Sequence, residues 1–391
     1  MNATSWPVGL GPVLCIVGAR PNFMKMAPIL RAFAEHQPPI PTVLVHTGQH
    51  YDKDMSDKLF EDLCLPRPGI NLEVGSGSHA VQTAEVMKRF EPLLDDFRPS
   101  AVLVVGDVNS TLACSLVAVK RGVPTVHVEA GLRSFDRAMP EEINRILTDQ
   151  IADRLYTTER DAAPNLEREG IPAERVRFVG NVMIDSLLFH REKAKRPQDI
   201  LAAAGVDPAI LAGARGYGLI TLHRPSNVDS PETLGPLLTT LRTISDTIPL
   251  IFALHPRTRA NIERFGLGDV VATPRMILLP PQGYLEMIGL MSSSLVVITD
   301  SGGLQEETTA LGVPCLTVRE NTERPITIDE GTNTLVGCDP AAILAATESV
   351  LATGGKRGRV PEFWDGQAAR RIAEDIACWL LARTAAAQGA Q

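Results

Sequence analysis

Six apolar, strand-like runs in this sequence are followed at once by residues that can bind anions or transfer protons. The residues concerned are Arg20 and Lys25; Asp107; Glu129; His223 and Arg224; His255 and Arg257; and Asp300, Ser301, Gly302 and Gly303. At a single strand end, a polar residue is as easily a structural cap as a functional group. Parallel strands, however, place their carboxyl ends at one edge of a sheet, where α/β proteins bind ligands. Six such ends therefore favour a site that combines anion binding with acid–base chemistry.

The stretch DSGGLQEETTALG (300–312) is the clearest candidate for an anion site. Asp300 and Ser301 suit the N-cap of a helix, and the following pair, Gly302 and Gly303, lets backbone approach a ligand closely. The amino end of such a helix offers free N–H groups and the positive end of its dipole to a phosphate. An ordinary capped helix is the alternative interpretation.

Further charged residues can complete this anion site. Arg20, His223 and Arg224 could neutralise the remaining phosphate charge. Of Glu306 and Glu307, we expect one to face the ligand and accept hydrogen bonds from a ribose. The other would then be a surface residue that complements the helix dipole.

The carboxylates form a second group. Asp107 and Glu129 end strands that should be neighbours, and Pro140 suits the first turn of a helix that carries Glu141 and Glu142. For Glu141 and Glu142, the purely structural explanation is that they stabilise the start of the helix. Acids aimed at one cleft from three segments could instead move protons on and off a substrate. We expect Glu142 in the site and Glu141 at the helix start.

The histidines show no metal-binding spacing such as HxxxH or HExxH, and we predict no metal site. His127 lies inside a strand-like run and is most simply an interior histidine with satisfied hydrogen bonds. His46 and His50, around HTGQHYD, could line the cleft or stabilise a turn. GSGSHA (75–80) only loosely matches a dinucleotide fingerprint and does not follow the first strand of a βαβ unit.

The elements that must position these residues alternate regularly. Short apolar runs of this kind suit strands buried on both faces, and the helical patterns between them, such as 26–36 and 111–122, predict βαβ units with parallel sheets. The predicted strands are 13–18, 42–48, 101–107, 125–131, 154–158, 175–180, 217–223, 249–255, 276–281, 294–300 and 314–318.

The alternation stops at the polar segment 190–205 and then restarts, which predicts two doubly wound, Rossmann-like domains. We expect an N-terminal domain over 1–188 with the catalytic acids and a C-terminal domain over 189–365 with the anion site. The tail 366–391 has helical spacing and should pack back on the first domain. A chain of 391 residues is long enough for two cores of ordinary size.

Composition restricts the class of partner. The formal net charge of −8 argues against a general nucleic-acid or anionic-membrane binder. No apolar run is long enough to span a bilayer, and the N-terminus lacks a signal-peptide pattern. The six cysteines are scattered and mostly lie in apolar runs, so we expect reduced thiols and a cytoplasmic protein.

Taken together, the motifs resemble the non-hydrolysing UDP-N-acetylglucosamine 2-epimerase family. The resemblance covers about residues 13–340 in family order. It rests on GARPNFMKMAPI, TGQHYD, VVGDVNSTLA, VEAGLRSFDRAMPEEINR, GNVMIDSL, TLHRPSN, HPRTR, TDSGGLQEE and ENTERPITIDEGTN.

The resemblance implies a GT-B-type fold with a UDP-sugar between two domains, and a homodimer. It implies inversion at C2 of UDP-GlcNAc to give UDP-ManNAc, a precursor of cell-surface polysaccharide. UDP is eliminated to form 2-acetamidoglucal and is then added back, so no redox cofactor is required. A hydrolysing epimerase, a GT-B glycosyltransferase and a nucleotide-sugar sensor are the alternatives.

The resemblance also implies roles for single residues. Asp107, Glu129 and Glu142 or Glu141 would be the catalytic acids and bases. Glu307 would bind the ribose. The diphosphate would be held by Arg20, His223, Ser301 and Gly302, with His223 also counted as catalytic, and the remaining substrate-binding residues are Lys25, Arg133, Arg145, Arg224, His255 and Gly303.

One position departs from the family pattern. Many members have Glu after GxRP, whereas this chain has Asn22. Variants of this type occur in branches that act on related sugars, so a UDP-2,3-diacetamido uronic acid is the alternative substrate. His50 and His255 lie in motifs that some members use for a second, activating UDP-GlcNAc.

Overall fold

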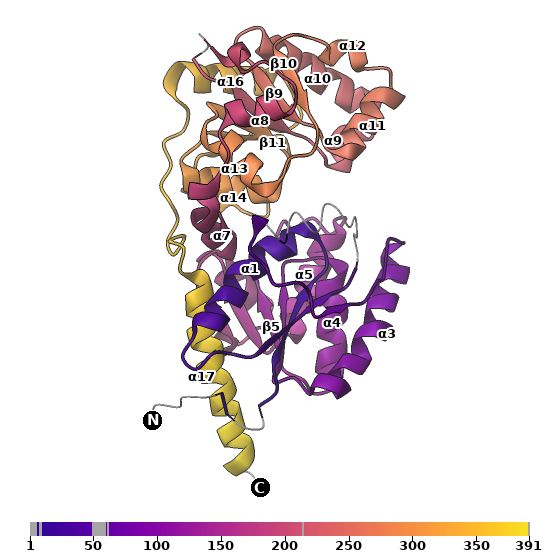
Figure 1. Ribbon diagram of the computed structural model, residues 1–391, viewed down its shortest axis with the longest axis vertical. Helices are drawn as coiled ribbons and strands as arrows, with labels where there is room; N and C mark the ends of the chain where they lie inside the picture. The colour runs from indigo at the N-terminus through magenta and orange to yellow at the C-terminus, as the bar shows by residue number, and fades with distance from the viewer. Residues whose placement is uncertain (1–5, 8–9, 49–59, 61, 213–214, 390–391) are drawn as a thin grey trace. The chain divides into compact units, whose positions relative to one another are not determined.

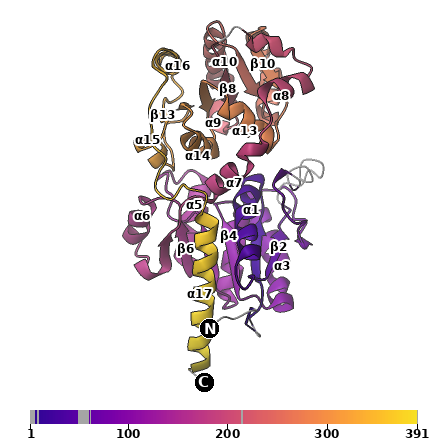
Figure 2. The same ribbon diagram turned by 60° about the vertical axis from the view of Figure 1, so that its left-hand side comes forward.

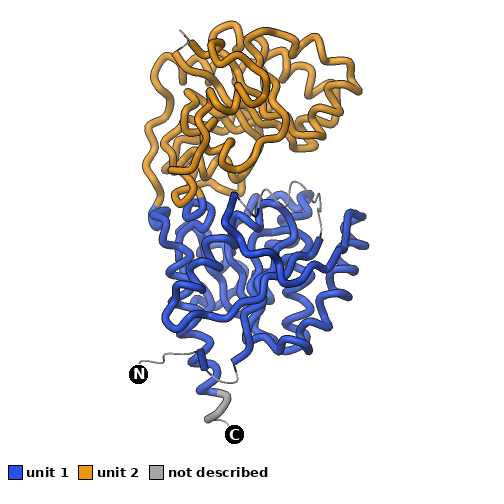
Figure 3. The backbone as a smooth tube through the Cα atoms, viewed as in Figure 1, with its two compact units in different colours: residues 1–186, 362–391 blue, residues 187–361 orange. Residues whose placement is uncertain are grey.

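The computed structural model describes residues 6–7, 10–48, 60, 62–212 and 215–389. The chain forms two compact units, which Figure 3 colours separately: Met1–Ser186 with Glu362–Gln391, and Leu187–Pro361. Each unit is built on its own parallel sheet with helices on both faces (Figures 1 and 2). The predicted fold class, α/β with two doubly wound domains, is confirmed.

In the described part of unit 1, the strand order is β3-β2-β1-β4-β5-β6-β7, and all pairs are parallel. The strands are β1 (Val13–Val17), β2 (Thr42–His46), β3 (Ile70–Asn71), β4 (Ala101–Val105), β5 (Thr125–Val128), β6 (Arg154–Thr157) and β7 (Val176–Phe178). The helices are α1 (Arg20–Glu35), α3 (His79–Phe97), α4 (Asn109–Lys120), α5 (Pro140–Ile151), α6 (Ala162–Arg168), α7 (Val182–His190), which continues into unit 2, and α17 (Ala368–Gly389), with a 3-10 turn at Ala173–Arg175.

The described part of unit 2 repeats this plan with the order β10-β9-β8-β11-β12-β13. Its strands are β8 (Gly218–Thr221), β9 (Leu250–Ala253), β10 (Met276–Leu279), β11 (Val296–Thr299), β12 (Cys315–Thr317) and β13 (Asn333–Leu335). Its helices are α8 (Pro197–Ala203), α9 (Pro225–Val228), α10 (Pro231–Ser245), α11 (Pro256–Arg264), α12 (Gly268–Val271), α13 (Tyr284–Ser292), α14 (Gly302–Leu311), α15 (Ile326–Asp329) and α16 (Pro340–Thr353), with 3-10 turns at Arg191–Lys193 and Pro208–Leu211.

Apolar strand residues explain why the sheets form. β1 and β4 are buried along their whole length, as expected for central parallel strands covered on both faces. Alternate residues of these strands, such as Leu14 and Val102, pack in one core with Val86 and Phe90 of α3. On another helix layer of unit 1, α17 packs against α1.

Both sheets have a topological switch point, where the strand order reverses. It lies between β1 and β4 in unit 1 and between β8 and β11 in unit 2. Ligands of open α/β sheets bind beyond the carboxyl ends of strands at such points. The four segments that follow these strands contain Arg20 and Lys25, Asp107, His223 and Arg224, and Asp300 to Gly303.

Several elements differ from the sequence-based expectation. Helix α1 begins at Arg20, before the predicted 26–36, because Pro21 is well placed in the first turn of a helix. The short edge strands β3 and β13 were not predicted, because their polar sequences carry no apolar run. The polar segment 190–205 contains α8, whose Ile200 and Leu201 are buried.

Candidate functional site

The turn after β1 is built around the buried Asn22 side chain. Its Oδ1 atom accepts hydrogen bonds from the backbone N–H groups of Gly18 (3.1 Å) and Ala19 (2.9 Å). Its Nδ2 atom donates to the Val105 carbonyl at the end of β4 (3.0 Å). Asn22 therefore ties the turns after two neighbouring strands together through backbone contacts. Arg20, by contrast, is the half-buried first residue of α1.

Lys25 carries a buried positive charge to the same edge of the sheet. Its side chain is 8% exposed, and its Nζ atom forms an ion pair with Glu129 Oε2. Lys25 also approaches the turn after β4, since a Cβ atom added to Gly106 would lie 3.0 Å from Nζ. Gly106 has φ +67°, a left-handed conformation that favours glycine. Lys25 thus lies between Glu129 and the residue that precedes Asp107.

Glu129 has an unusual backbone conformation. Its φ is +75°, although it is not glycine, and its side chain is 5% exposed. The N–H groups of both Glu129 and Ala130 donate to the Tyr156 carbonyl at 3.0 Å. Non-glycine residues held in this region cluster at functional sites, where the surrounding structure maintains the strain.

Arg145 joins the other two acids. Its guanidinium donates to Asp107 Oδ2 (3.0 Å) and forms an ion pair with Glu142 Oε2. Glu142 is almost fully buried and also accepts hydrogen bonds from Ser134 N–H (3.0 Å) and Phe135 N–H (2.9 Å). Asp107 remains 24% exposed at its side chain. Of the three acids, Asp107 is therefore the most open to a ligand.

The neighbouring glutamates of α5 differ in environment. Glu142 is buried in the hydrogen bonds described above, whereas Glu141 is half-buried in the first turn beside Pro140. A negative charge at this position complements the helix dipole.

Arg133 and His127 do not join the acid cluster by direct contact with Asp107, Glu129 or Glu142. The Arg133 guanidinium donates to Asp149 (2.7 Å) and to Glu169 (2.8 and 2.7 Å), and these bonds raise its pKa despite burial. His127 is fully buried with both ring nitrogens hydrogen-bonded, so the prediction of a satisfied interior histidine is confirmed.

In unit 2, Asp300 organises the turn after β8. Its carboxylate accepts hydrogen bonds from the backbone N–H groups of His223 (3.0 Å) and Arg224 (2.9 Å) and lies 2.8 Å from His223 Nδ1. Burial alone would raise the pKa of Asp300, but the hydrogen bonds and charge of His223 and the Arg224 amide lower it below its ordinary value. The prediction that Asp300 caps the helix after β11 is wrong, because its oxygens face the His223 turn.

Ser301 is the N-cap residue of α14 by its backbone, and its side chain makes no capping hydrogen bond. Gly302 begins the helix in a crowded place, since an added Cβ atom would lie 2.6 Å from Glu323 Oε1 and 2.8 Å from an Arg324 nitrogen. Gly303 follows it in the first turn. The glycine at position 302 thus allows the start of α14 to approach two buried charged side chains, as a close backbone approach requires.

The expectation that Glu306 or Glu307 lies on the surface is wrong, because both are buried. Glu306 forms an ion pair with Arg324 Nε at 2.8 Å. Glu307 lies near Tyr284, whose pKa is raised well above its usual value by burial and by the Glu307 carboxylate. A surface glutamate that only complements the helix dipole would not need a buried arginine or tyrosine beside it. Both glutamates therefore interact with the interior of unit 2.

Sequence reasoning missed the charged group behind α14. Glu323 accepts from Arg319 (2.9 Å) and pairs with Arg324, and all three side chains are at most 7% exposed. Glu323 and Arg324 lie in the motif ENTERPITIDEGTN (320–333), and Arg319 directly precedes it. A dense run of opposite charges after an apolar strand was the available signal.

His255 is exposed at the start of α11, where it accepts a hydrogen bond from Arg257 N–H (3.2 Å). Its ring lies 5.5 Å from that of His223, and its pKa is lowered by partial burial and by the nearby positive charges of His223 and Arg257. His46 is buried at the end of β2, where burial lowers its pKa to about 4. His50 lies outside the described residues.

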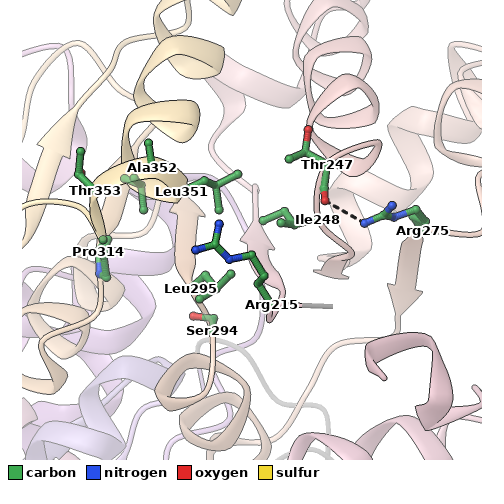
Figure 4. A pocket seen from close by; sticks show the side chains of 12 residues that line it. Arg215, Thr247, Ile248, Arg275, Ser294, Leu295, Pro314, Leu351, Ala352 and Thr353 are labelled. Atoms are coloured by element: carbon green, nitrogen blue, oxygen red, sulfur yellow. Dashed lines mark hydrogen bonds between the residues drawn. The ribbon is translucent and has the colours of Figure 1, made fainter. Parts of the chain in front are cut away.

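A pocket of about 900 Å³ lies at the opposite edge of the unit 2 sheet. Its lining includes Arg215, Ser294, Leu295 and Pro314, which precede β8, β11 and β12 (Figure 4). Arg275 is bonded to the Thr247 carbonyl there (3.0 Å). Because this is the amino edge of the strands, the pocket is separate from the candidate site.

The described residues show no sign of a metal centre or a membrane span. They contain no group of three or more His, Cys, Asp or Glu side chains placed to hold a metal ion. Among the helices described, none has the length and apolar character needed to cross a membrane.

This chain is similar to known proteins over most of its length. A family model described as UDP-N-acetylglucosamine 2-epimerase matches residues 32–377. The UDP-N-acetylglucosamine 2-epimerase of Methanococcus maripaludis is 41% identical over 360 residues, which is 91% of this chain and 96% of the relative. The UDP-2,3-diacetamido-2,3-dideoxy-D-glucuronate 2-epimerase of Pseudomonas aeruginosa is 42% identical over 93% of this chain and 99% of its own length.

A solved structure is similar over nearly the whole chain. The UDP-GlcNAc 2-epimerase of Methanocaldococcus jannaschii, crystallised with UDP-GlcNAc and UDP, superposes with a TM-score of 0.84 at 39% identity. The match covers 93% of this chain and 99% of that one. With these matches, the chain belongs to the UDP-N-acetylglucosamine 2-epimerase family.

Proposed function

We propose that this protein is a non-hydrolysing 2-epimerase that interconverts UDP-GlcNAc and UDP-ManNAc. The observation that carries the proposal is the set of Asp107 after β4, Glu129 after β5 and Glu142 in the first turn of α5. These acids come from three segments and are held by two buried cations, Lys25 and Arg145. Such a set suits proton transfer to and from a carbon atom of a bound sugar.

The first half of the reaction is an elimination. A carboxylate takes the proton from C2 of the sugar, the C–H electron pair becomes the C1–C2 double bond, and the C1–O bond breaks. The bonding pair of that C1–O bond leaves with the diphosphate oxygen of UDP. The products are 2-acetamidoglucal and UDP, and no oxidation or reduction occurs.

The second half reverses these steps on the other face of C2. A carboxylic acid gives a proton to C2, the double-bond electrons form the new C–H bond, and UDP oxygen attacks C1. Both halves need UDP to be stabilised as it departs and kept until it returns. This requirement accounts for an anion site and an acid cluster in one protein.

We assign the base role at C2 to Asp107 or Glu129. The Asp107 side chain is 24% exposed. Glu129 forms an ion pair with Lys25, which lies beside Gly106, the residue before Asp107. Glu142 is saturated by Ser134, Phe135 and Arg145, so in this geometry it fixes the loop and the Arg145 guanidinium beside Asp107. Arg133 would support this loop from behind, through Asp149 and Glu169.

Unit 2 would hold the nucleotide. The amino end of α14, with Ser301, Gly302 and Gly303, suits the diphosphate, and Asp300 fixes the neighbouring turn of His223 and Arg224. We assign ribose binding to Glu307, which Tyr284 and the interior of the unit hold in place. We also assign diphosphate binding to Arg20. No redox cofactor or metal enters this scheme.

A related sugar is the second candidate substrate. The Pseudomonas aeruginosa relative, named for UDP-2,3-diacetamido-2,3-dideoxy-D-glucuronate, is as similar in sequence as the UDP-N-acetylglucosamine 2-epimerase of Methanococcus maripaludis. Asn22 does not by itself favour this sugar, because its side chain contacts backbone atoms of residues 18, 19 and 105.

The test is to incubate the protein with each UDP-sugar separately and to follow the products by NMR. We expect UDP-ManNAc from UDP-GlcNAc, no free ManNAc and no need for an acceptor. Asp107→Asn should abolish turnover while UDP still binds. Release of free ManNAc would indicate a hydrolysing enzyme, and acceptor-dependent UDP release would indicate a glycosyltransferase. UDP binding without any turnover by the unmodified protein would leave only a sensor.

We further propose a homodimer that works in the cytoplasm, where its product would enter synthesis of cell-surface polysaccharide. The six cysteines are all free, which fits a reducing compartment. Light scattering after size-exclusion chromatography tests the oligomeric state, and a monomeric mass would exclude the dimer.

A further inference from the structure

We propose that His127 and Asp149 are positioning residues for the reaction, with His127 held as a buried imidazolium that fixes the turns carrying Asp107 and Glu129. His127 lies in β5 and Asp149 in α5, and both are fully buried. Neither residue can reach a substrate from such a position. Their role must therefore be exerted through the residues they bind.

The hydrogen bonds of His127 define its protonation state. Nε2 lies 2.8 Å from the Gly106 carbonyl oxygen, and a carbonyl can only accept. Nδ1 lies 2.6 Å from Asp149 Oδ1. Burial would raise the pKa of Asp149, but His127 and the Arg133 guanidinium, which donates to its other oxygen at 2.7 Å, hold that pKa below its ordinary value, so we take this carboxyl as ionised. Both ring nitrogens therefore donate, which is the imidazolium form.

Asp149 connects this ring to the turn after β5. Its Oδ2 atom accepts a hydrogen bond from Gly131 N–H at 3.0 Å as well as from Arg133. Gly131 is two residues beyond Glu129, whose own backbone is held at φ +75°. Three donors from β5 and its turn thus converge on one buried carboxylate. These bonds offset the strain of the Glu129 conformation.

The other ring nitrogen connects the same carboxylate to Asp107. Gly106, which accepts from His127, immediately precedes Asp107, and its φ of +67° sets the direction in which the chain leaves β4. Asp149 also lies on α5, the helix that carries Glu142 and Arg145. One buried His–Asp pair therefore joins the three segments that carry Asp107, Glu129 and Glu142.

The alternative is that the pair only stabilises unit 1. A purely structural pair would change the free energy of unfolding but not the reaction of the folded protein. A positioning pair would lower kcat, because a displacement of a reacting group by about 1 Å can cost about 100-fold in rate. Affinity for UDP, whose proposed contacts are mostly in unit 2, should change little.

The experiment compares Asp149→Asn with a matched control, Asp375→Asn. Asp375 is a carboxylate of the same unit that bonds the side chains of Arg154 and Tyr156 (2.8 Å to the hydroxyl) in β6, whereas the Glu129 turn is bonded to the backbone carbonyl of Tyr156. Turnover, UDP affinity and thermal unfolding are measured for both. We expect kcat to fall about 10- to 100-fold in Asp149→Asn and less than about 2-fold in Asp375→Asn, with UDP affinity retained in both. Equal kcat values for the two variants would overturn the proposal.

A second measurement needs neither turnover nor a folded variant of Asp149. In the unmodified protein labelled with ¹⁵N-histidine, both ring nitrogens of His127 should resonate as protonated nitrogens at neutral pH, with the signal assigned by its loss in His127→Asn. A neutral ring would overturn the imidazolium. The kinetic arm rests on the proposed function and the spectrum does not, so a protein without epimerase activity but with a doubly protonated His127 would refute only the function.

Discussion

Lys25 and Glu129 form an ion pair in a place where water is almost excluded, with side-chain exposures of 8% and 5%. The glutamate sits on a strained turn and the lysine in the second turn of a helix from another βαβ unit. Burying two opposite charges is favourable only as a pair, because either charge alone loses its hydration without compensation. A residue of the proposed catalytic group, Glu129, is therefore also one half of an ion pair on which the stability of unit 1 depends.

Removing one member of the pair should be much more harmful than removing both. We expect Lys25→Met to destabilise unit 1 by about 3 kcal/mol, and Lys25→Met with Glu129→Gln to recover most of this loss. Urea unfolding of the single and double variants provides the measurement. Lys88→Met is the control, since the Lys88–Glu85 pair is exposed and should be worth less than about 1 kcal/mol. A double variant as unstable as the single one would contradict the account.

We expect activity to require Gly106 for the space that it leaves beside Lys25 Nζ, and not only for its positive φ. Gly106→Ala should lose about 1 kcal/mol of stability because a residue with a side chain is strained at a positive φ. It should also displace Lys25 Nζ, which lies 3.0 Å from the position of an added Cβ atom. Gly122→Ala is a matched control with φ +70° and no atom within 4 Å of the added Cβ. Both variants should lose similar stability, but only Gly106→Ala should lose kcat, by about 10-fold or more. Equal kcat losses in the two would show that Lys25 placement is unimportant.

The sequence predicted the strands that form the middle of each sheet because continuous apolar runs between helical patterns have few other solutions. It also predicted which residues follow those strands, and hence the Asp107, Glu129 and Asp300 positions. Contacts made across the sheet edge could not be read from it. Such contacts depend on which segments become neighbours in space. Examples are the hydrogen bonds of Asp300 to the His223 turn, the burial of Glu306 and Glu307, and the hydrogen bonds that Asp149 accepts. Edge strands β3 and β13 were missed because they are short and polar.

Gly302 should be needed for nucleotide binding. Its missing side chain leaves room for Glu323 and Arg324, so Gly302→Ala must push them or the start of α14 aside. We expect the Kd for UDP to rise about 10-fold or more. Gly268→Ala is the matched control, because Gly268 also begins a helix and has no atom within 4 Å of an added Cβ. Calorimetric titration with UDP distinguishes the two, and unchanged affinity in Gly302→Ala would remove α14 from the nucleotide site.

Asp185 should make stability fall as pH rises through the weakly acidic range. Its carboxyl accepts hydrogen bonds from Ala368 and Ala369 N–H at the start of α17, yet burial raises its pKa from 3.8 to about 6. Because the folded-state pKa is raised, the folded protein retains this proton between these two pH values while the unfolded chain loses it. The resulting penalty is absent below pH 3.8 and fully present above about pH 6.

Asp185→Asn removes this penalty. We expect the variant to gain stability relative to the unmodified protein as pH rises from 4 to 7, by up to about 3 kcal/mol at about 1.4 kcal/mol per pKa unit. Thermal unfolding across this range is the measurement. Asp199→Asn, at an exposed ion pair with Arg196, should show little pH-dependent difference. A relative stability of Asp185→Asn that falls with pH would contradict the burial argument.

The proposed acid cluster is tested most directly by the reaction of UDP-GlcNAc in D₂O. The proposed mechanism removes the C2 proton and returns one derived from solvent. UDP-ManNAc should therefore form with deuterium at C2. With Asp107→Asn, we expect no UDP-ManNAc and no deuterium at C2 of UDP-GlcNAc. UDP-ManNAc that retains the original hydrogen at C2 would contradict the account.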